Sequence, residues 1–158
     1  MNSNYAQVAD MVEQGQLHWA TDPINAVLLT SAAFDGAHQR LSDIPLKTVI
    51  GTAPIQGRWL GADGQAMGLP ATFPRAKSGV EYQVVVTKDD GRSNPILLSW
   101  LDEDSDGETL GVLRSGTLII RPYYDNSVQP AATGIIRLQD SPPPEPPPPT
   151  VGVWMVLT

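Results

Sequence analysis

The sequence predicts a mainly β protein: a β-sandwich or jelly-roll-like barrel with one short N-terminal helix and an extended proline-rich C-terminal arm. Fifteen prolines and fourteen glycines among 158 residues favour many turns and short strands over long helices. About eight short apolar runs are separated by turns rich in Gly, Pro and Asp, the spacing typical of sandwiches and barrels. We expect a β-rich body with the helix over residues 1–139, a rigid proline-rich linker over 140–150 and an apolar docking peptide over 151–158.

The helix is predicted over residues 3–14. Tyr5, Val8 and Val12 recur at helical spacing, so they should form one buried face that packs on the body. Gly15 is well placed to end the helix, because glycine readily adopts the conformation that follows a helix C-terminus. The other expected positions are Ser3 or Asn4 as the N-cap and Gln7, Asp10 and Glu13 on the exposed face.

The strands follow as short apolar runs between turn residues. Residues 24–30 form a continuous apolar run, which indicates a buried strand. Residues 81–87 alternate in character, and the Asp90-Gly91 pair after them is a hairpin signature. One helical turn is expected at residues 41–44, and the prolines flanking 69–73 restrict that segment to a sheet edge or bulge. The complete set of expected strands is 24–30, 46–50, 55–60, 69–73, 81–87, 95–101, 117–121 and 134–138.

Charge and composition exclude several classes of function. The formal net charge is −7 and the ten Lys and Arg residues do not cluster, which argues against nucleic-acid binding. No apolar run approaches the roughly 18 residues needed to span a bilayer, and the N-terminus shows no signal-peptide pattern, so no membrane association is expected. The absence of cysteine excludes disulfides, thiolate metal sites and a cysteine nucleophile.

Two groups of residues resemble sites of metal or acid–base chemistry and are interpreted otherwise. Residues 102–107 match the first half of a calcium loop, but the position that requires a bidentate Glu is Leu113, so we predict a metal-free acidic turn. His18 and His38 are the only histidines, and Asp35 and Asp43 lie near His38 without the spacing of a metal site. We therefore expect no catalytic residue, no metal and no cofactor.

The C-terminal arm is the expected partner-binding element. Prolines over residues 142–149, interrupted by Glu145, favour a stiff polyproline II spacer of roughly 25 Å at about 3.1 Å per residue. The uncharged apolar peptide after it is expected to dock on another subunit, with Trp154 as anchor and some backbone pairing to a sheet edge. The predicted partner-binding residues are Pro146, Pro147, Val151, Val153, Trp154, Met155, Val156 and Leu157.

Three stretches carry a resemblance to a protein family. They are GQLHWATDPINAVLLTSAAFDGAHQRLSDIP at residues 15–45, YQVVVTKDDGRSNPILLSWLDED at 82–104 and TGIIRL at 133–138. In this order, after a short helix, they resemble small structural virion proteins of tailed bacteriophages. The resemblance covers roughly residues 5–139 and leaves the proline arm outside. It implies a structural role in the particle and transfers no catalytic residue.

The expected function is therefore that of a non-enzymatic virion protein, assembled in the host cytoplasm. We expect a capsid decoration or cement protein that is anchored to neighbouring subunits through its C-terminal arm. A neck, tail or fibre-attachment protein is one alternative. In either position, the expected partners of the chain are the major capsid protein or neck and tail proteins, together with copies of itself. The other alternative is a host-glycan-binding module, for which the plausible exposed aromatics are Trp59, Trp100, Tyr123 and Tyr124.

Overall fold

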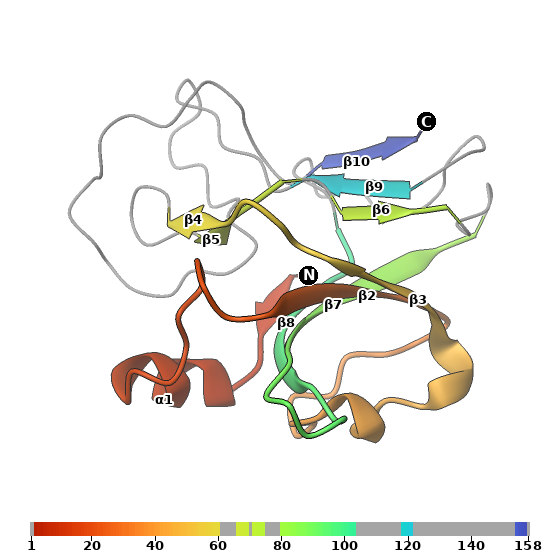
Figure 1. The fold of residues 1–158 in the computed structure, drawn as a ribbon. Coiled ribbons are helices and arrows are strands. Elements are labelled where there is room, and N and C mark those ends of the chain that lie inside the picture. The colour runs from red at the N-terminus through yellow and green to blue at the C-terminus, as the bar shows by residue number, and fades with distance from the viewer. Residues whose placement is uncertain are drawn as a thin grey trace.

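The structure, a computed structural model, describes residues 2–60, 66–69, 71–74, 80–103, 118–121 and 154–157. Within these residues the chain is mainly β, as predicted, and its strand pairs are antiparallel. Figure 1 shows a strongly curved main sheet with a smaller sheet stacked beside it, so the arrangement is sandwich-like.

The main sheet has five strands in the order β1-β8-β7-β2-β3. Its central strands pair over their whole length, because β2 and β7 are in continuous register from Ile24 opposite Lys88 to Thr30 opposite Tyr82. This pairing joins the apolar run near the N-terminus to the hairpin in the second half of the chain. The strand bounds are β1 Ser3–Asn4, β2 Ile24–Thr30, β3 Val49–Pro54, β7 Tyr82–Lys88 and β8 Ile96–Leu101.

Two smaller sheets complete the strands that the structure describes. One has three strands in the order β10-β9-β6, and the other pairs β4 with β5. Ala71 and Phe73 of β6 belong to the same apolar cluster as Ala26 and Leu28 of β2, which places the three-stranded sheet against one face of the main sheet. The strand bounds are β4 Trp59–Leu60, β5 Ala66–Met67, β6 Ala71–Phe73, β9 Leu118–Arg121 and β10 Trp154–Leu157.

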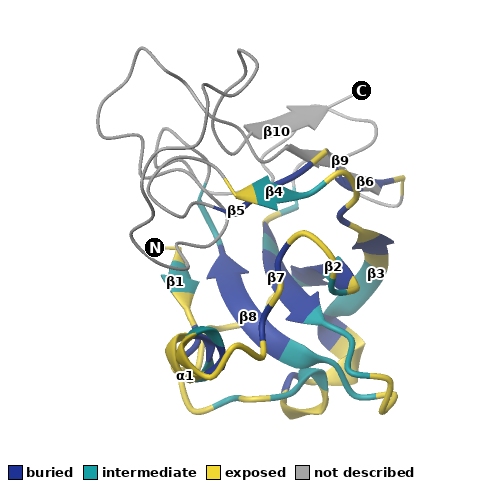
Figure 2. Ribbon diagram, turned by 60° about the vertical axis from the view of Figure 1, so that its left-hand side comes forward, coloured by how far each residue is buried: buried dark blue, intermediate teal, exposed yellow. Residues whose placement is uncertain are grey.

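The main sheet is buried on both faces, and each face has its own apolar cluster. Side chains alternate along a strand, so Leu28 packs into one cluster and Leu29 into the other, and neither is exposed to solvent. We call the first the helix face, because it also holds Val8 and Met11 of the helix. The second, the loop face, consists of Tyr5, Val27, Leu29, Ile44, Val85, Leu97 and Trp100, with Ala32, Leu41 and Val49 packed against them. Figure 2 shows β2, β7 and β8 as largely buried strands.

The N-terminal helix is shorter than predicted. Helix α1 spans Gln7–Glu13, and its N-cap is Ala6. Ser3 and Asn4, expected as cap residues, instead form β1, because β8 offers them backbone partners opposite Trp100 and Ser99. Gly15 follows the helix with a φ of +65°, in agreement with its predicted role.

The buried face of the helix also differs in part from the prediction. Tyr5 and Val8 are buried as expected, but Tyr5 precedes α1 and packs on the loop face, while Met11 takes its place on the helix face. Val12 is only half-buried. Gln7, expected in solvent, is half-buried because its amide donates hydrogen bonds to the carbonyl oxygens of Gln39 and Leu97.

Among the predicted strands, the apolar run at 24–30 and the hairpin strands are confirmed with shifts of at most one residue, and residues 41–43 form the predicted helical turn. The strands predicted at 46–50 and 55–60 are wrong in their bounds. Residues 46–48 form a 3-10 turn, and β3 then runs through Gly51 to Pro54, which an edge strand tolerates. Of residues 55–60, only β4 at the end is a strand. The predicted strand at 134–138 lies outside the described residues.

Arg58 ties the helix face together through backbone carbonyl groups. Its Nε donates to the carbonyl oxygen of Trp19 at 2.7 Å, and its two terminal nitrogens donate to the carbonyl oxygens of Ile55 and Asp22. The Trp19 indole Nε1 in turn donates to the Met67 carbonyl oxygen at 2.7 Å. These bonds hold the turn before β2 against β4 and β5.

Asp22 and Lys88 form an ion pair at the edge of this cluster, 2.7 Å apart. Burial would raise the pKa of the Asp22 carboxyl, but hydrogen bonds from Lys88 and from the His18 amide outweigh it, so the pKa lies below its ordinary value of 3.8. A carboxylate of this kind stabilises the fold above the unfolded pKa, and its contribution is lost as pH falls through the folded pKa.

We therefore expect the free energy of unfolding to fall as pH drops below about 5. Urea denaturation at a series of pH values measures the effect. Asp22→Asn should flatten the acid limb of this profile, because it removes a carboxylate that binds protons more weakly when folded. Glu13→Gln, on the exposed side of α1, is the control and should leave the shape of the profile unchanged. An Asp22→Asn profile identical to that of the wild type would contradict the assignment.

Candidate functional site

The loop face carries a pocket of about 540 Å³. Two segments build it, namely the chain that leaves β2 and the chain that leads into β3, and Ile44 connects it to the apolar cluster beneath. Both segments cross the loop face because their apolar residues Ala32 and Ile44 pack against the main sheet. The lining residues are Ser31, Ala32, Ala33, Phe34, Asp35, Gly36, His38, Ile44, Pro45, Lys47 and Thr48.

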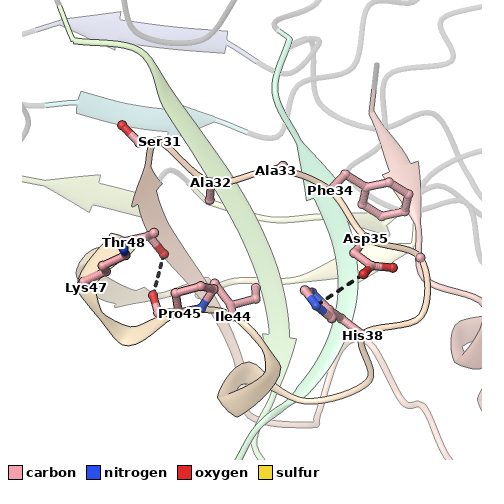
Figure 3. A pocket seen from close by; sticks show the side chains of 11 residues that line it. Ser31, Ala32, Ala33, Phe34, Asp35, His38, Ile44, Pro45, Lys47 and Thr48 are labelled. Atoms are coloured by element: carbon pink, nitrogen blue, oxygen red, sulfur yellow. Dashed lines mark hydrogen bonds and ion pairs between the residues drawn. The ribbon is translucent and has the colours of Figure 1, made fainter.

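The two ends of the pocket carry opposite charges. Figure 3 shows Lys47 and Thr48 at one end and Asp35 and His38 at the other. His38 Nε2 lies 3.6 Å from Asp35 Oδ2, and Asp35 Oδ1 accepts a 2.9 Å hydrogen bond from the Ala37 amide, which holds the carboxylate in place. Lys47 forms no ion pair with any other residue that the structure describes. The pocket is therefore polarised along its length.

Aromatic rings flank the acidic end. The Phe34 ring lies 5.3 Å from the Tyr5 ring and 6.0 Å from the Trp100 ring, measured between centroids. Burial, followed by the negative charge of Asp35, raises the pKa of the Tyr5 hydroxyl to about 12, so the phenol is neutral at physiological pH. Tyr5 Oη, Trp100 Nε1 and His38 Nδ1 are buried without a hydrogen-bond partner in the described part of the chain.

The two histidines lie in different places and serve different neighbours. His18 Nδ1 is 4.0 Å from Asp22 Oδ1 in the turn before β2, whereas His38 belongs to the pocket. Asp43 does not join His38 in a metal site; it accepts hydrogen bonds from the amides of Arg40 and Gln39, which lower the pKa of its carboxyl. Within the described ranges, no group of three or more His, Cys, Asp or Glu side chains is placed to hold a metal.

The acidic segment after β8 is described only at its start. The amides of Asp102 and Glu103 both donate to the Asn2 side-chain oxygen, at 2.9 and 3.1 Å, so the N-terminus braces this point of the chain. Residues 104–108, where the metal-free turn is predicted, lie outside the described residues. None of the described helices is long and apolar enough to cross a membrane.

The aromatic set expected for glycan binding is not available as predicted. Trp100 is 1% exposed, because it packs into the loop face, so its ring cannot stack on a sugar. Trp59 is half-buried in β4, with its indole nitrogen buried. Tyr123 and Tyr124 lie outside the described residues. The exposed aromatic of the loop face is instead Phe34, at 41%.

The C-terminal peptide is a strand, but its partner in the structure is its own chain. Strand β10 pairs antiparallel with β9, from Trp154 opposite Arg121 to Leu157 opposite Leu118. The expectation that another subunit supplies this partner strand is corrected here: β9 offers an edge within the same chain, and pairing within a chain avoids the entropy cost of association. The other predicted docking residues, namely Pro146, Pro147, Val151 and Val153, lie outside the described residues.

No protein-family model, no curated protein and no solved structure matches the chain. The sequence draws attention to His38 and Asp35 but does not predict the pocket, nor the exposure of Phe34, which lines it, at 41% and of Leu46, between two lining residues, at 84%. The available signal was weak: Phe34 is an isolated large apolar residue in a polar, irregular segment, and Leu46 begins the apolar run predicted as a strand over 46–50. Convergence of residues 31–38 with 44–48 depends on packing against the sheet, which no local pattern encodes.

Proposed function

We propose that the chain is a non-enzymatic structural protein of a bacteriophage virion, acting as a capsid decoration or cement protein. The neck, the tail or a fibre attachment is the alternative position. The proposed partners of the chain are the major capsid protein or neck and tail proteins, together with copies of itself. The anchoring role of the C-terminal arm is not part of this proposal, because β10 pairs with β9 of the same chain.

One observation carries the proposal. The stretches at 15–45 and 82–104, which bear the resemblance to phage virion proteins, supply β2, β7 and β8. These three strands are neighbours at the centre of the main sheet. These two stretches therefore fold together and contribute residues to both clusters, which supports reading them as one unit; the third stretch, 133–138, lies outside the described residues.

The surface of the loop face is a second support. Phe34, which lines the pocket, and Leu46, which lies between two lining residues in the chain, both expose apolar area, and exposed apolar area is a feature of contact surfaces between proteins. A particle protein that binds a fixed neighbour would cover such a surface on assembly.

The test is the protein content of purified particles from a phage that encodes this chain. We expect mass spectrometry to find the chain in gradient-purified virions in a fixed ratio to the major capsid protein. A non-structural protein of the same phage serves as the control for carry-over. Subnanometre density should then place the β-sandwich on the capsid or at the neck and tail. Absence of the chain from washed particles, with the protein present in infected cells, would refute the proposal.

A further inference from the structure

Two apolar side chains remain exposed in the segments that build the pocket. Leu46 begins the 3-10 turn Leu46–Thr48 and is 84% exposed, the highest value among the described large apolar residues. It lies between Pro45 and Lys47, which both line the pocket. Phe34, 41% exposed, lines the same pocket from the other segment. Leu46 therefore neighbours two lining residues in the chain, does not line the pocket itself and leaves its side chain in solvent.

One positively charged and one negatively charged side chain lie at opposite ends of the pocket. Figure 3 shows Lys47 at one end of the pocket and Asp35 and Phe34 at the other. Leu46 precedes Lys47 in the chain. The Asp35 side chain is 58% exposed, so its carboxylate can accept a further partner in addition to Ala37 and His38. Each end therefore offers one apolar and one charged group, and the charges of the two ends are opposite.

A surface of this design is complementary to itself. In a two-fold contact the same patch of each copy faces the other in reverse direction, so residue i meets residue j and j meets i. Turning one copy through 180° over the pocket brings the Lys47 end of one onto the Asp35 end of the other. The apolar contact and the ion pair then each form twice.

We propose that the loop face is a two-fold interface between two copies of this chain. In it, Leu46 of each copy enters the other's pocket against Phe34, and Lys47 of each copy pairs with Asp35 of the other. The pocket of about 540 Å³ has ample room for a leucine side chain. The inference deepens the proposed function, which includes copies of the chain as partners, by naming the contact surface; it concerns two free copies in solution and does not require a particle.

Sedimentation velocity of the full chain over a wide concentration range tests the inference. We expect a reversible monomer–dimer equilibrium. Leu46→Asp should weaken the dimer at least about tenfold, because each dimer loses two central contacts. Leu69→Asp is the matched control: Leu69 is a leucine that is 52% exposed, does not line the pocket and follows shortly after β5, whose Ala66 packs in the helix-face cluster. It should leave the dimerisation constant within about threefold of the wild type.

The ionic part is tested by exchanging the charges. Lys47→Glu alone and Asp35→Lys alone should each weaken the dimer, because like charges then face one another in both pairs. The double variant restores opposite charges and should recover most of the lost affinity. This recovery is specific, since a substitution that merely disturbs the loop would not be rescued by a second one.

A cross-link gives an independent measurement, because the chain contains no cysteine. A mixture of Leu46→Cys chains and Phe34→Cys chains, each carrying a different tag, should form a disulfide-linked heterodimer under mild oxidation. Three results would overturn the inference: a wild type that is monomeric at every concentration, a dimer that Leu46→Asp leaves intact, and a double charge variant without recovery. A monomer whose binding to virions needs Leu46 would assign the face to a different partner and would equally overturn it.

Discussion

Trp19→Ala should lower the free energy of unfolding by about 3–5 kcal/mol, the cost typical of removing a large buried aromatic side chain. Trp19 is 2% exposed and packs in the helix-face cluster. Its indole nitrogen bonds the Met67 carbonyl oxygen, and its own carbonyl oxygen accepts from Arg58. The substitution therefore leaves a cavity and an unpaired buried acceptor at the point where the turn before β2 meets β5. Urea denaturation followed by circular dichroism gives the loss.

Trp19→Phe separates the two contributions. It keeps most of the apolar volume but cannot donate to the Met67 oxygen, so we expect a loss of about 1–3 kcal/mol. Leu46→Ala serves as the control, since a residue 84% exposed in the monomer should change the stability by no more than about 0.5 kcal/mol when measured at low protein concentration. If Trp19→Ala costs less than about 1 kcal/mol, Trp19 is not part of a packed core.

Leu28→Ala and Leu29→Ala should each lower the free energy of unfolding by about 2–5 kcal/mol. Both leucines are fully buried in β2, but Leu28 packs on the helix face and Leu29 on the loop face. Adjacent residues of a strand point to opposite sides, so equal sensitivity at both positions is the signature of a sheet covered on two faces. Thermal or urea unfolding of the two variants provides the comparison.

The alternative outcome is equally specific. In a sheet with one solvated face, one of the two substitutions would cost less than about 0.5 kcal/mol. If Leu29→Ala is the tolerated substitution, residues 31–48 do not cover the loop face, and the pocket disappears with them. Val85→Ala, in the strand beside β2 and on the loop face, would then also be tolerated. A lower free energy of unfolding for both Leu29→Ala and Val85→Ala would instead support the apolar cluster on the loop face.

Local sequence signals were sufficient for the central strands. The apolar run at β2 and the hairpin of β7 and β8 were predicted within one residue, because each is a short strand bounded by turn chemistry. Gly15 marked the end of the helix by another local signal, because glycine readily adopts the positive φ, here +65°, that follows a helix C-terminus. The mainly β class followed from these elements and from the number of prolines and glycines.

Contacts between distant segments account for what the sequence did not predict. Ser3 and Asn4 are helix-capping residues by type, yet they join β8 because its edge satisfies their backbone groups. The isolated Arg58 carries no motif, but it binds two carbonyl groups of the remote turn before β2. β10 was predicted to pair with a neighbour and pairs with β9, and the pocket exists only where residues 31–38 meet 44–48. Alternation and turn chemistry act over a few residues, whereas a strand's partner and a pocket's walls depend on which surfaces meet when the whole chain packs.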